Sequence, residues 1–137
     1  MEEAKEAKED PTRAPPEGKR PLVGIGVIVL NKDRKVLVGK RKKEGLYGFP
    51  GGHLELYETW EGCCHRELKE ETGLDIPAKA FTLFHVANIV APEKGYHFTV
   101  VDLACKMDPK QKAVGMEPDK CDQWIWVTSK EISDNID

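Results

Sequence analysis

The chain lacks long apolar runs, and none of its hydrophobic stretches approaches the ~20 residues that a helix needs to cross a bilayer. It also lacks an excess of positive charge, since 21 Lys and Arg residues stand against 24 Asp and Glu residues. The resulting formal net charge of -3 argues against general binding to nucleic-acid polymers or anionic membranes. From its 137 residues we expect a single domain with one core, and neither class of partner.

Cysteines are few, and no two of them form a CxxC pair. The four are Cys63, Cys64, Cys105 and Cys121. This spacing indicates neither a zinc knuckle nor a disulfide framework. Reduced thiols predict a cytoplasmic location, with the nucleus left open. For Cys63 and Cys64 we expect a place in the core rather than a role in catalysis.

The first 20 residues contain three prolines, many charges and, apart from Met1, no aliphatic side chain larger than alanine. Such a segment buries too little apolar surface to offset the entropy lost on ordering. We therefore predict a disordered charged tail over residues 1–20 and a folded domain over residues 21–137. The tail also lacks the apolar stretch of a secretory signal.

Hydrophobic patterning predicts several strands in the folded part. Residues 22–30 form a β-branched run typical of a strand buried on both faces, and residues 35–40 are expected to return as its hairpin partner. Residues 79–90 and 96–107 read as two strands around a turn, and residues 123–127 as a last strand. Strands interrupted by one long helix predict an α/β sandwich around a mixed sheet.

That helix carries an unusual acidic cluster. If residues 66–72 are helical, Glu67, Glu70 and Glu71 stand at positions i, i+3 and i+4 on one side. Like charges held so close repel each other unless a cation lies between them, and oxygen ligands suit Mg²⁺ or Mn²⁺ better than Zn²⁺. A solvated acidic face is the alternative that the spacing alone leaves open.

The surroundings of the cluster favour the metal site. Trp60, Cys63 and Cys64 share the azimuth of the glutamates, so the first half of this face is expected to pack on the core. A glycine pair at residues 51–52 precedes the helix and allows the backbone to approach a ligand closely. Gly73 is predicted to end the helix in the left-handed conformation.

Residues 52–74 read GHLELYETWEGCCHRELKEETGL and match the pattern G-x5-E-x7-R-E-U-x-E-E-x-G-U, where U is aliphatic. This pattern resembles the signature of the Nudix hydrolases at every specified position. GKRKK before the glycine loop, residues 116–121 (MEPDKC), Trp124 and Trp126 extend the similarity. They look like the MutT-type nucleotide pyrophosphatases, especially the plant cytosolic enzymes and the animal thiopurine-nucleotide hydrolase. The resemblance covers roughly residues 22–132 and implies a Nudix-type α/β/α sandwich with a partly antiparallel sheet.

The resemblance also implies a set of metal ligands and catalytic groups. Mg²⁺, with Mn²⁺ as a substitute, would be held by carboxylates and by one backbone carbonyl. The expected ligands are Glu67, Glu70, Glu71, Gly52 and, from the polar loop, Glu117. The catalytic group comprises Glu67, our first choice to deprotonate the attacking water, Glu70 as the second choice, and Arg66. Arg66 is expected to tie Glu58, Glu70 or both, holding the carboxylates in place.

Substrate contacts are expected around the glycine loop. Gly51 and Gly52 would approach the phosphates, and His53 would be a hydrogen-bonding partner of the substrate, with a satisfied structural histidine as the alternative. Lys40 and Arg41 would neutralise phosphate charge, with a solvated loop as the alternative. Tyr57 departs from the family pattern, which often has glycine immediately before the conserved glutamate.

The end of the sequence gives two further expectations. Trp124 and Trp126 share one face of the last strand, so at least one is expected in the core, while one stacking on a base is left open. Residues 128–131 (TSKE) form a capping box that starts a final helix. Since the chain stops at Asp137, we expect that helix to be shorter than in relatives.

The function implied is Mg²⁺-dependent hydrolysis of a nucleoside triphosphate, with dGTP or 8-oxo-dGTP as examples, to monophosphate and pyrophosphate. Such an enzyme would cleanse the nucleotide pool. Two alternatives stay open, because the glycine motif binds the diphosphate and not the group attached to it. One is hydrolysis of another diphosphate, such as ADP-ribose, a dinucleotide polyphosphate, an mRNA cap or an isoprenyl diphosphate. The other is a non-catalytic nucleotide-binding module. Similar proteins are often homodimers, but no seam is visible in the sequence.

Overall fold

The computed structural model describes residues 20–41, 47–107, 109–115 and 121–135. Its strands are β1 (Leu22–Leu30), β2 (Val36–Arg41), β3 (Tyr47–Gly48), β4 (Gly51–His53), β5 (Thr82–Ala91), β6 (Tyr96–Lys106) and β7 (Cys121–Val127). Its helices are α2 (Trp60–Thr72) and α3 (Ser129–Asn135), and two 3-10 turns, Ala78–Ala80 and Pro92–Lys94, flank β5. The predicted tail over residues 1–20 stays a prediction, since residues 1–19 lie outside the described part.

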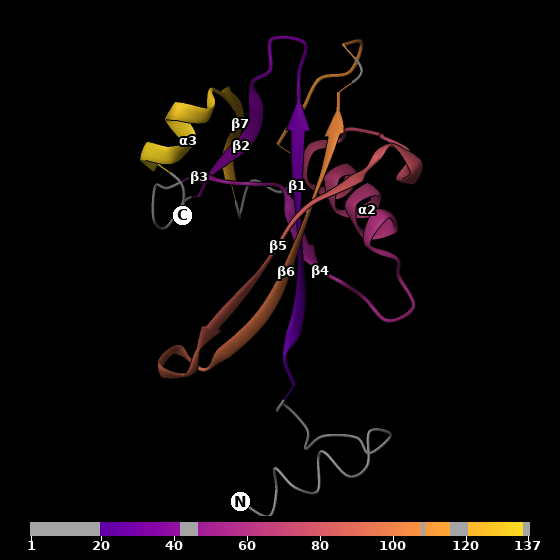
Figure 1. Ribbon diagram of the computed structural model, residues 1–137. Helices are drawn as coiled ribbons and strands as arrows, with labels where there is room; N and C mark the ends of the chain where they lie inside the picture. Colours follow the sequence, from indigo (N-terminus) through magenta and orange to yellow (C-terminus); the bar gives the residue numbers. More distant parts are fainter. Residues whose placement is uncertain (1–19, 42–46, 108, 116–120, 136–137) are drawn as a thin grey trace, which may run out of the picture.

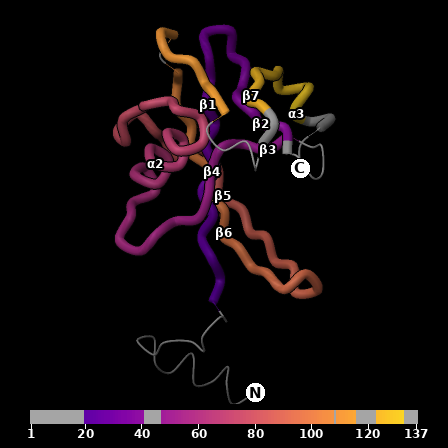
Figure 2. Tube along the Cα trace, turned by 180° about the vertical axis from the view of Figure 1, so that it is seen from behind, coloured from indigo at the N-terminus to yellow at the C-terminus, as the bar shows by residue number. Residues whose placement is uncertain are grey.

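The strands form one sheet in the order β3-β2-β1-β6-β5, with β4 paired to β1 and β7 paired to β2. β1 and β6 run parallel at the centre over nine residue pairs, whereas the remaining pairs are antiparallel. Figures 1 and 2 show α2 on one side of the strands and α3 on the other. The predicted α/β sandwich around a mixed, partly antiparallel sheet is confirmed.

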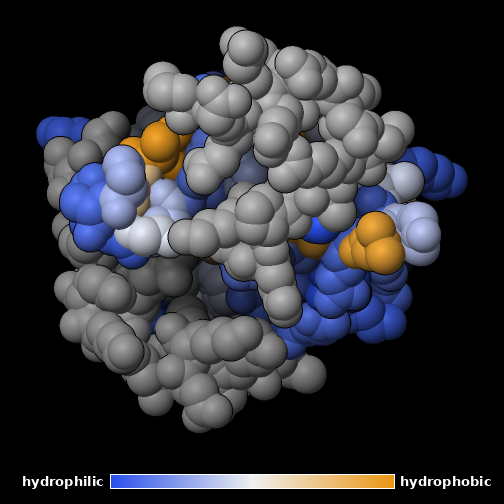
Figure 3. Space-filling model, turned by 90° about the horizontal axis from the view of Figure 1, so that it is seen from below, coloured by the Kyte–Doolittle hydropathy of each residue, from blue (hydrophilic) through white to orange (hydrophobic). Residues whose placement is uncertain are grey.

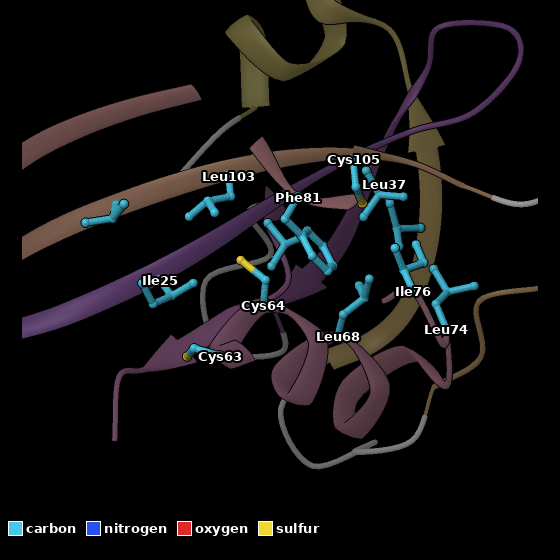
Figure 4. Close-up of a cluster of buried hydrophobic side chains, with 13 residues drawn as sticks. Ile25, Leu37, Cys63, Cys64, Leu68, Leu74, Ile76, Phe81, Leu103 and Cys105 are labelled. Carbon is cyan, nitrogen blue, oxygen red and sulfur yellow. The ribbon is translucent and has the colours of Figure 1, made fainter. Parts of the chain in front are cut away.

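The core lies between α2 and the sheet. Figure 4 shows side chains of β1, β6 and the segment after α2 converging on one face of α2. The helix contributes Cys63, Cys64 and Leu68, each fully buried. The expectation for the two cysteines is therefore confirmed, but Trp60 is 40% exposed, so the inner face of the helix begins one turn later than predicted.

β1 alternates rather than being buried throughout. Ile25, Val27 and Val29 are buried and belong to the core that faces α2, while the residues between them are half-buried. The prediction of burial on both faces is thus wrong for half of the strand. α2 covers one face, and small residues such as Gly24 and Gly26 lie on the other.

The predicted hairpin between β1 and β2 forms only at its base, where Leu30 pairs with Val36. Beyond that pair, β2 turns away and pairs with β7 and β3. The reason is that β4 occupies this edge of β1: its residues pair with Gly24–Gly26, and the Val27 N–H donates to the Pro50 carbonyl at 2.8 Å.

β5 starts three residues later than predicted, at Thr82, because Pro77 leads into a 3-10 turn over Ala78–Ala80. Together, β5 and β6 form a long twisted hairpin that projects away from α2 and α3 (Figure 1).

Among the described residues, no helix combines the length and apolarity needed to cross a membrane.

Candidate functional site

α2 is capped at both ends, and this fixes the place of its side chains. Thr59 precedes the helix in an extended conformation, and its hydroxyl oxygen accepts the Gly62 N–H at 3.0 Å. Gly73 ends the helix with φ 77°, and its N–H donates to the Lys69 carbonyl at 3.0 Å. The predicted end of the helix at Gly73 is confirmed.

The turn before α2 explains the departure at Tyr57. This residue has φ 69°, in the left-handed region that favours glycine, and it is 95% exposed. The Glu58 N–H closes the turn on the Glu55 carbonyl at 3.1 Å, and the Glu55 N–H donates to the Glu58 carboxylate at 3.0 Å. Tyr57 therefore adopts the conformation that a glycine would adopt here, at a cost in strain.

Arg66 donates hydrogen bonds to carboxylates in the turn before α2 and within α2 itself. Its Nε and Nη2 donate to the two oxygens of Glu58 at 2.6 and 2.9 Å, a bidentate pair. Its Nη1 donates to Glu67 at 2.7 Å and reaches Glu70 at 3.4 Å. The predicted tie to Glu58 and Glu70 is seen, and the shorter bond to Glu67 is an addition that helical spacing alone does not predict.

Hydrogen bonds from Arg66 lower the pKa of Glu58 to about 2, and hydrogen bonds to Glu58 raise the pKa of Arg66 above its usual range. Arg66 Nη2 also donates to the His53 carbonyl at 3.2 Å, which joins α2 to β4. This charged network therefore persists over the whole physiological pH range and holds Glu67 from one side.

Two of the three predicted acidic ligands lie against the glycine pair. The carboxylate of Glu67 occupies the space where a side chain on Gly52 would stand. The Gly51 N–H donates to Glu71 Oε1 at 2.7 Å, and a side chain at Gly51 would collide with the Ile25 carbonyl. Only glycines permit both close approaches, so Gly52 and Gly51 lie directly against Glu67 and Glu71, and the metal coordination predicted for this group stays a prediction.

Glu70 takes a different position. Its side chain is 51% exposed, compared with 13% for Glu67. Within the described ranges, no three His, Cys, Asp or Glu side chains converge closely enough to hold a metal ion. Glu67 accepts a hydrogen bond from Arg66, and Glu71 accepts one from the Gly51 N–H. The set nevertheless consists of oxygen donors on one helix side beside bare backbone, so its chemistry fits a hard divalent cation.

The remaining predicted site residues lie around this centre. Lys40 is exposed on β2 and pairs with Tyr47, and His53 is exposed on β4 with its ring 5.4 Å from that of Phe98. Only the backbone of Arg41 is described, and Glu117 falls outside the described residues. The substrate contacts predicted for Lys40, Arg41 and His53 therefore stay predictions, as does the metal contact predicted for Glu117.

Trp124 contributes a contact that sequence reasoning missed. Its indole Nε1 donates to the Glu71 carbonyl at 3.1 Å, so β7 anchors the last turn of the acidic helix. Trp124 and Trp126 are half-buried and pack against the core, as expected for their shared face. The alternation of the two tryptophans signalled the face, but nothing in the sequence indicated which backbone group the indole would bind.

Comparison with known proteins finds relatives both by sequence and by fold. RNA pyrophosphohydrolase of Hydrogenovibrio crunogenus is 44% identical over 59 residues, covering 43% of this chain and 34% of that protein. NAD-capped RNA hydrolase NudC of Vibrio atlanticus is 42% identical over 52 residues, covering 36% of this chain and 19% of that protein. This chain thus spans about a third or less of either relative's length.

A solved structure matches far more completely. The MutT NUDIX hydrolase of Burkholderia pseudomallei superposes with a TM-score of 0.73 at 25% identity, over 87% of this chain and 88% of that one. A family model described as NUDIX domain matches residues 20–137, which include both glycines, all three glutamates and Arg66. The protein therefore belongs to the NUDIX domain family.

Proposed function

We propose that this chain hydrolyses a nucleoside triphosphate, with dGTP and 8-oxo-dGTP as the leading substrates, to the monophosphate and pyrophosphate. The observation that carries the proposal is the placement of Glu67 and Glu71 against Gly52 and Gly51, with Arg66 fixing Glu67. The similarity of GKRKK and of residues 116–121 to the plant cytosolic and animal thiopurine-nucleotide enzymes supports the choice of substrate.

Mg²⁺, or Mn²⁺ in its place, would be held by Glu67, Glu70 and Glu71 with the Gly52 carbonyl, and Glu117 is proposed as a further ligand. A bound divalent cation stabilises charge on phosphate oxygens and lowers the pKa of water. Its binding would require Glu67 and Glu71 to exchange part of their present hydrogen bonds for the cation.

The chain's own residues then have separate tasks. The bare backbone of Gly51 and Gly52 lets a phosphate approach without steric hindrance. Glu67 accepts the proton of the attacking water, whose oxygen bonds to phosphorus while the bond from phosphorus to the leaving pyrophosphate oxygen breaks. Arg66 keeps the Glu67 carboxylate in one orientation, and Glu70 is our second choice as the base.

The alternative substrate is a diphosphate on a different group. The two relatives above carry names that refer to RNA, which makes an RNA 5′ end the first alternative, followed by ADP-ribose and other diphosphates. The expectation that no nucleic-acid polymer binds therefore stays a prediction, as does the cytoplasmic location inferred from reduced thiols. A non-catalytic module is less favoured, because such a module has no need to hold two carboxylates on a glycine pair.

The deciding experiment is product analysis by chromatography after incubating the protein and Mg²⁺ with nucleoside triphosphates, ADP-ribose and a 5′-triphosphorylated RNA. Monophosphate plus pyrophosphate from dGTP or 8-oxo-dGTP, abolished in Glu67→Gln, is the expected result. Turnover of RNA or ADP-ribose alone would overturn the proposed substrate but leave the proposed site residues unaffected. No turnover of any compound, with Mg²⁺ still bound, would favour the binding module.

We also propose a homodimer formed through β5. This strand lies at the edge of the sheet and exposes large apolar side chains, including Phe84 at 66% and Val90 at 61%. Figure 3 shows hydrophobic side chains at the surface near the β5–β6 hairpin, on the left. β5 contains no Asp, Glu, Lys or Arg, so two copies can pair edge to edge without like-charge repulsion.

Light scattering after gel filtration tests this assembly. The native protein is expected to have twice the mass of one chain. Val90→Lys is expected to give monomers, because it places a charge at the β5 interface. The matched control is Leu56→Lys, which changes an equally apolar but isolated residue that is 82% exposed. A monomeric native protein would overturn the proposal.

A further inference from the structure

Four residues on four adjacent strands form a single row across the sheet. In the strand registers, Gly51 of β4 pairs with Gly26 of β1, Gly26 pairs with Asp102 of β6, and Asp102 pairs with His85 of β5. Paired residues on neighbouring strands project to the same face of a sheet. The row therefore extends from Gly51, one of the two glycines of the candidate site, across β1 and β6 to β5.

This row lies on the face turned away from α2. Ile25, Val101 and Leu103 are the sequence neighbours of the row and are buried in the core that packs on α2. Because side chains alternate along a strand, Gly26 and Asp102 face the opposite way. The side chain of Asp102 is 20% exposed there, so solvent and ligands reach it.

Asp102 is held over bare backbone. One of its carboxylate oxygens, Oδ1, lies where a side chain on Gly26 would stand, so only glycine fits at that position. The other oxygen, Oδ2, lies 3.6 Å from Nδ1 of His85. His85 thus borders the carboxylate on the β5 side, while Oδ1 extends over Gly26 toward the strand of Gly51.

The residues that neighbour this row on the same face are apolar. The space above Gly24 is bordered by the Phe98 ring and by a Val100 methyl group, each 3.7 Å from where a side chain on Gly24 would begin. An apolar, partly aromatic border on the same sheet face as a partly buried carboxylate is an environment for a planar ligand that carries polar groups on one edge. The ring of Tyr96 lies 5.7 Å from that of Phe98 and extends the apolar border.

The spacing matches a nucleotide. Gly51 and Asp102 are separated by two strand spacings, about 10 Å, which is comparable to the reach from a nucleotide's phosphate to the far edge of its base. With the diphosphate at Gly51 and Gly52, a nucleoside that extends along the row brings the edge of its base to Asp102. This step rests on the proposed function, which places the phosphates at the glycine pair.

We propose that Asp102, positioned by His85, selects guanine nucleotides by accepting hydrogen bonds from the base. An ionised carboxylate can only accept hydrogen bonds. Guanine offers two adjacent N–H donors on one edge, at N1 and at the 2-amino group, so one carboxylate can accept both. Adenine presents an acceptor at N1, which would face the carboxylate and lose a hydrogen bond.

Binding without metal provides a test that does not depend on turnover. Calorimetric titration with GMP, IMP and AMP is expected to show GMP bound at least tenfold more tightly than AMP, with IMP between them because it lacks the 2-amino donor. Asp102→Asn and Asp102→Ala are expected to lose at least tenfold in GMP affinity and most of this discrimination. The matched control Asp33→Asn, in the exposed turn after β1, is expected to change neither.

Turnover supplies the second readout. The ratio of kcat/KM for GTP to that for ATP is expected to fall in Asp102→Asn, and to fall less in His85→Ala, which leaves the carboxylate present but less fixed. Discrimination between GTP and dGTP is expected to stay unchanged, whereas its loss in Asp102→Asn would show that Asp102 binds ribose and would overturn the proposal.

The outcomes separate this inference from the proposed function. Unchanged GMP affinity in both Asp102 variants, with circular dichroism showing a native fold, would overturn the inference while leaving hydrolysis intact. Asp102-dependent GMP binding in a protein that hydrolyses no nucleotide would support the inference and overturn the proposed activity.

Discussion

Arg66 is the residue around which the site is held together, because its guanidinium binds Glu58 before the helix, Glu67 within it and the His53 carbonyl on β4. Arginine suits this role because its donors have a fixed planar arrangement and its charge persists at every relevant pH. The orientation of the Glu67 carboxylate therefore depends on how this one side chain shares its donors.

At the scale of single residues, Glu67→Gln and Glu71→Gln are each expected to lower kcat by a factor of about 100 or more, since charge at the metal carries much of the barrier reduction. Steady-state kinetics at saturating Mg²⁺ measures the change. Glu93→Gln, in the exposed 3-10 turn after β5, is the matched control and should keep native turnover. Near-native turnover in Glu67→Gln would rule out its role as the base.

The ion pair of Glu58 with Arg66 predicts a pH dependence of stability. The pKa of Glu58 is lowered to about 2 in the folded protein, mainly by hydrogen bonds from Arg66, from an ordinary value of 4.5. Because the folded pKa is the lower one, the stabilisation is complete above about pH 4.5 and is lost as the pH falls through 2.

Urea unfolding of native protein and Glu58→Gln tests this prediction. The difference in unfolding free energy is expected to be about 1–2 kcal/mol at pH 7, as for a charge-assisted pair with some solvent screening, and to shrink steadily between pH 4.5 and pH 2. A difference that stays constant down to pH 2 would show that the carboxylate charge contributes nothing to the pair.

At the scale of elements, the turn that leads into α2 carries local strain at Tyr57. A non-glycine residue in the left-handed region costs roughly 1–2 kcal/mol, and the flexibility of glycine in the unfolded chain returns part of that. Tyr57→Gly is therefore expected to raise the unfolding free energy by about 0.5–1 kcal/mol. Its side chain is 95% exposed, so little contact is lost.

The neighbouring residue Leu56 supplies the control for this turn. It is also exposed, at 82%, but does not have a positive φ angle. Leu56→Gly is thus expected to cost about 0.5–1 kcal/mol through unfolded-state entropy alone. Denaturant unfolding of both variants gives the comparison, and equal destabilisation by the two glycines would contradict the strain at Tyr57.

The elements differ in how well their sequences predict them. α2, its end at Gly73 and the capping box at Thr128 and Glu131 were predictable because helix caps and spacing are local properties. The partner of β2 was not, because β4 displaces it from β1, and that exchange joins segments far apart in the chain.

The site shows the same contrast between local patterns, which the sequence predicts, and long-range pairing, which it does not. The meeting of the motif glycines with Glu67 and Glu71 follows from a fixed pattern of residues within one segment. The row that contains Asp102 and His85 depends on the register of four strands, and no local pattern encodes it. Long-range strand register is the information that sequence spacing does not contain.

At the scale of the whole molecule, the buried thiols report on global unfolding. Burial raises the pKa values of Cys63, Cys64 and Cys105 to about 12. These thiols stay protonated in the folded protein up to about that pH, and only the thiolate reacts with alkylating reagents. At pH 8, we expect all three to resist iodoacetamide while the protein is folded and to react in urea.

Peptide mass spectrometry after timed alkylation measures this protection. Because the three thiols come from α2 and β6 on both sides of one core, their rates of modification are expected to rise together with urea concentration. Fast labelling of Cys63 alone in native buffer would instead show that α2 opens separately from the sheet.

The parallel pairing of β1 with β6 also has a consequence for synthesis on the ribosome. The last residue of β6, Lys106, follows the last residue of β1, Leu30, by 76 positions. At 5–20 residues per second, this apolar strand waits roughly 4–15 s for the partner that completes the centre of the sheet. The centre of the sheet therefore cannot be completed until residue 106 has been synthesised, after β4 and α2 have already been made.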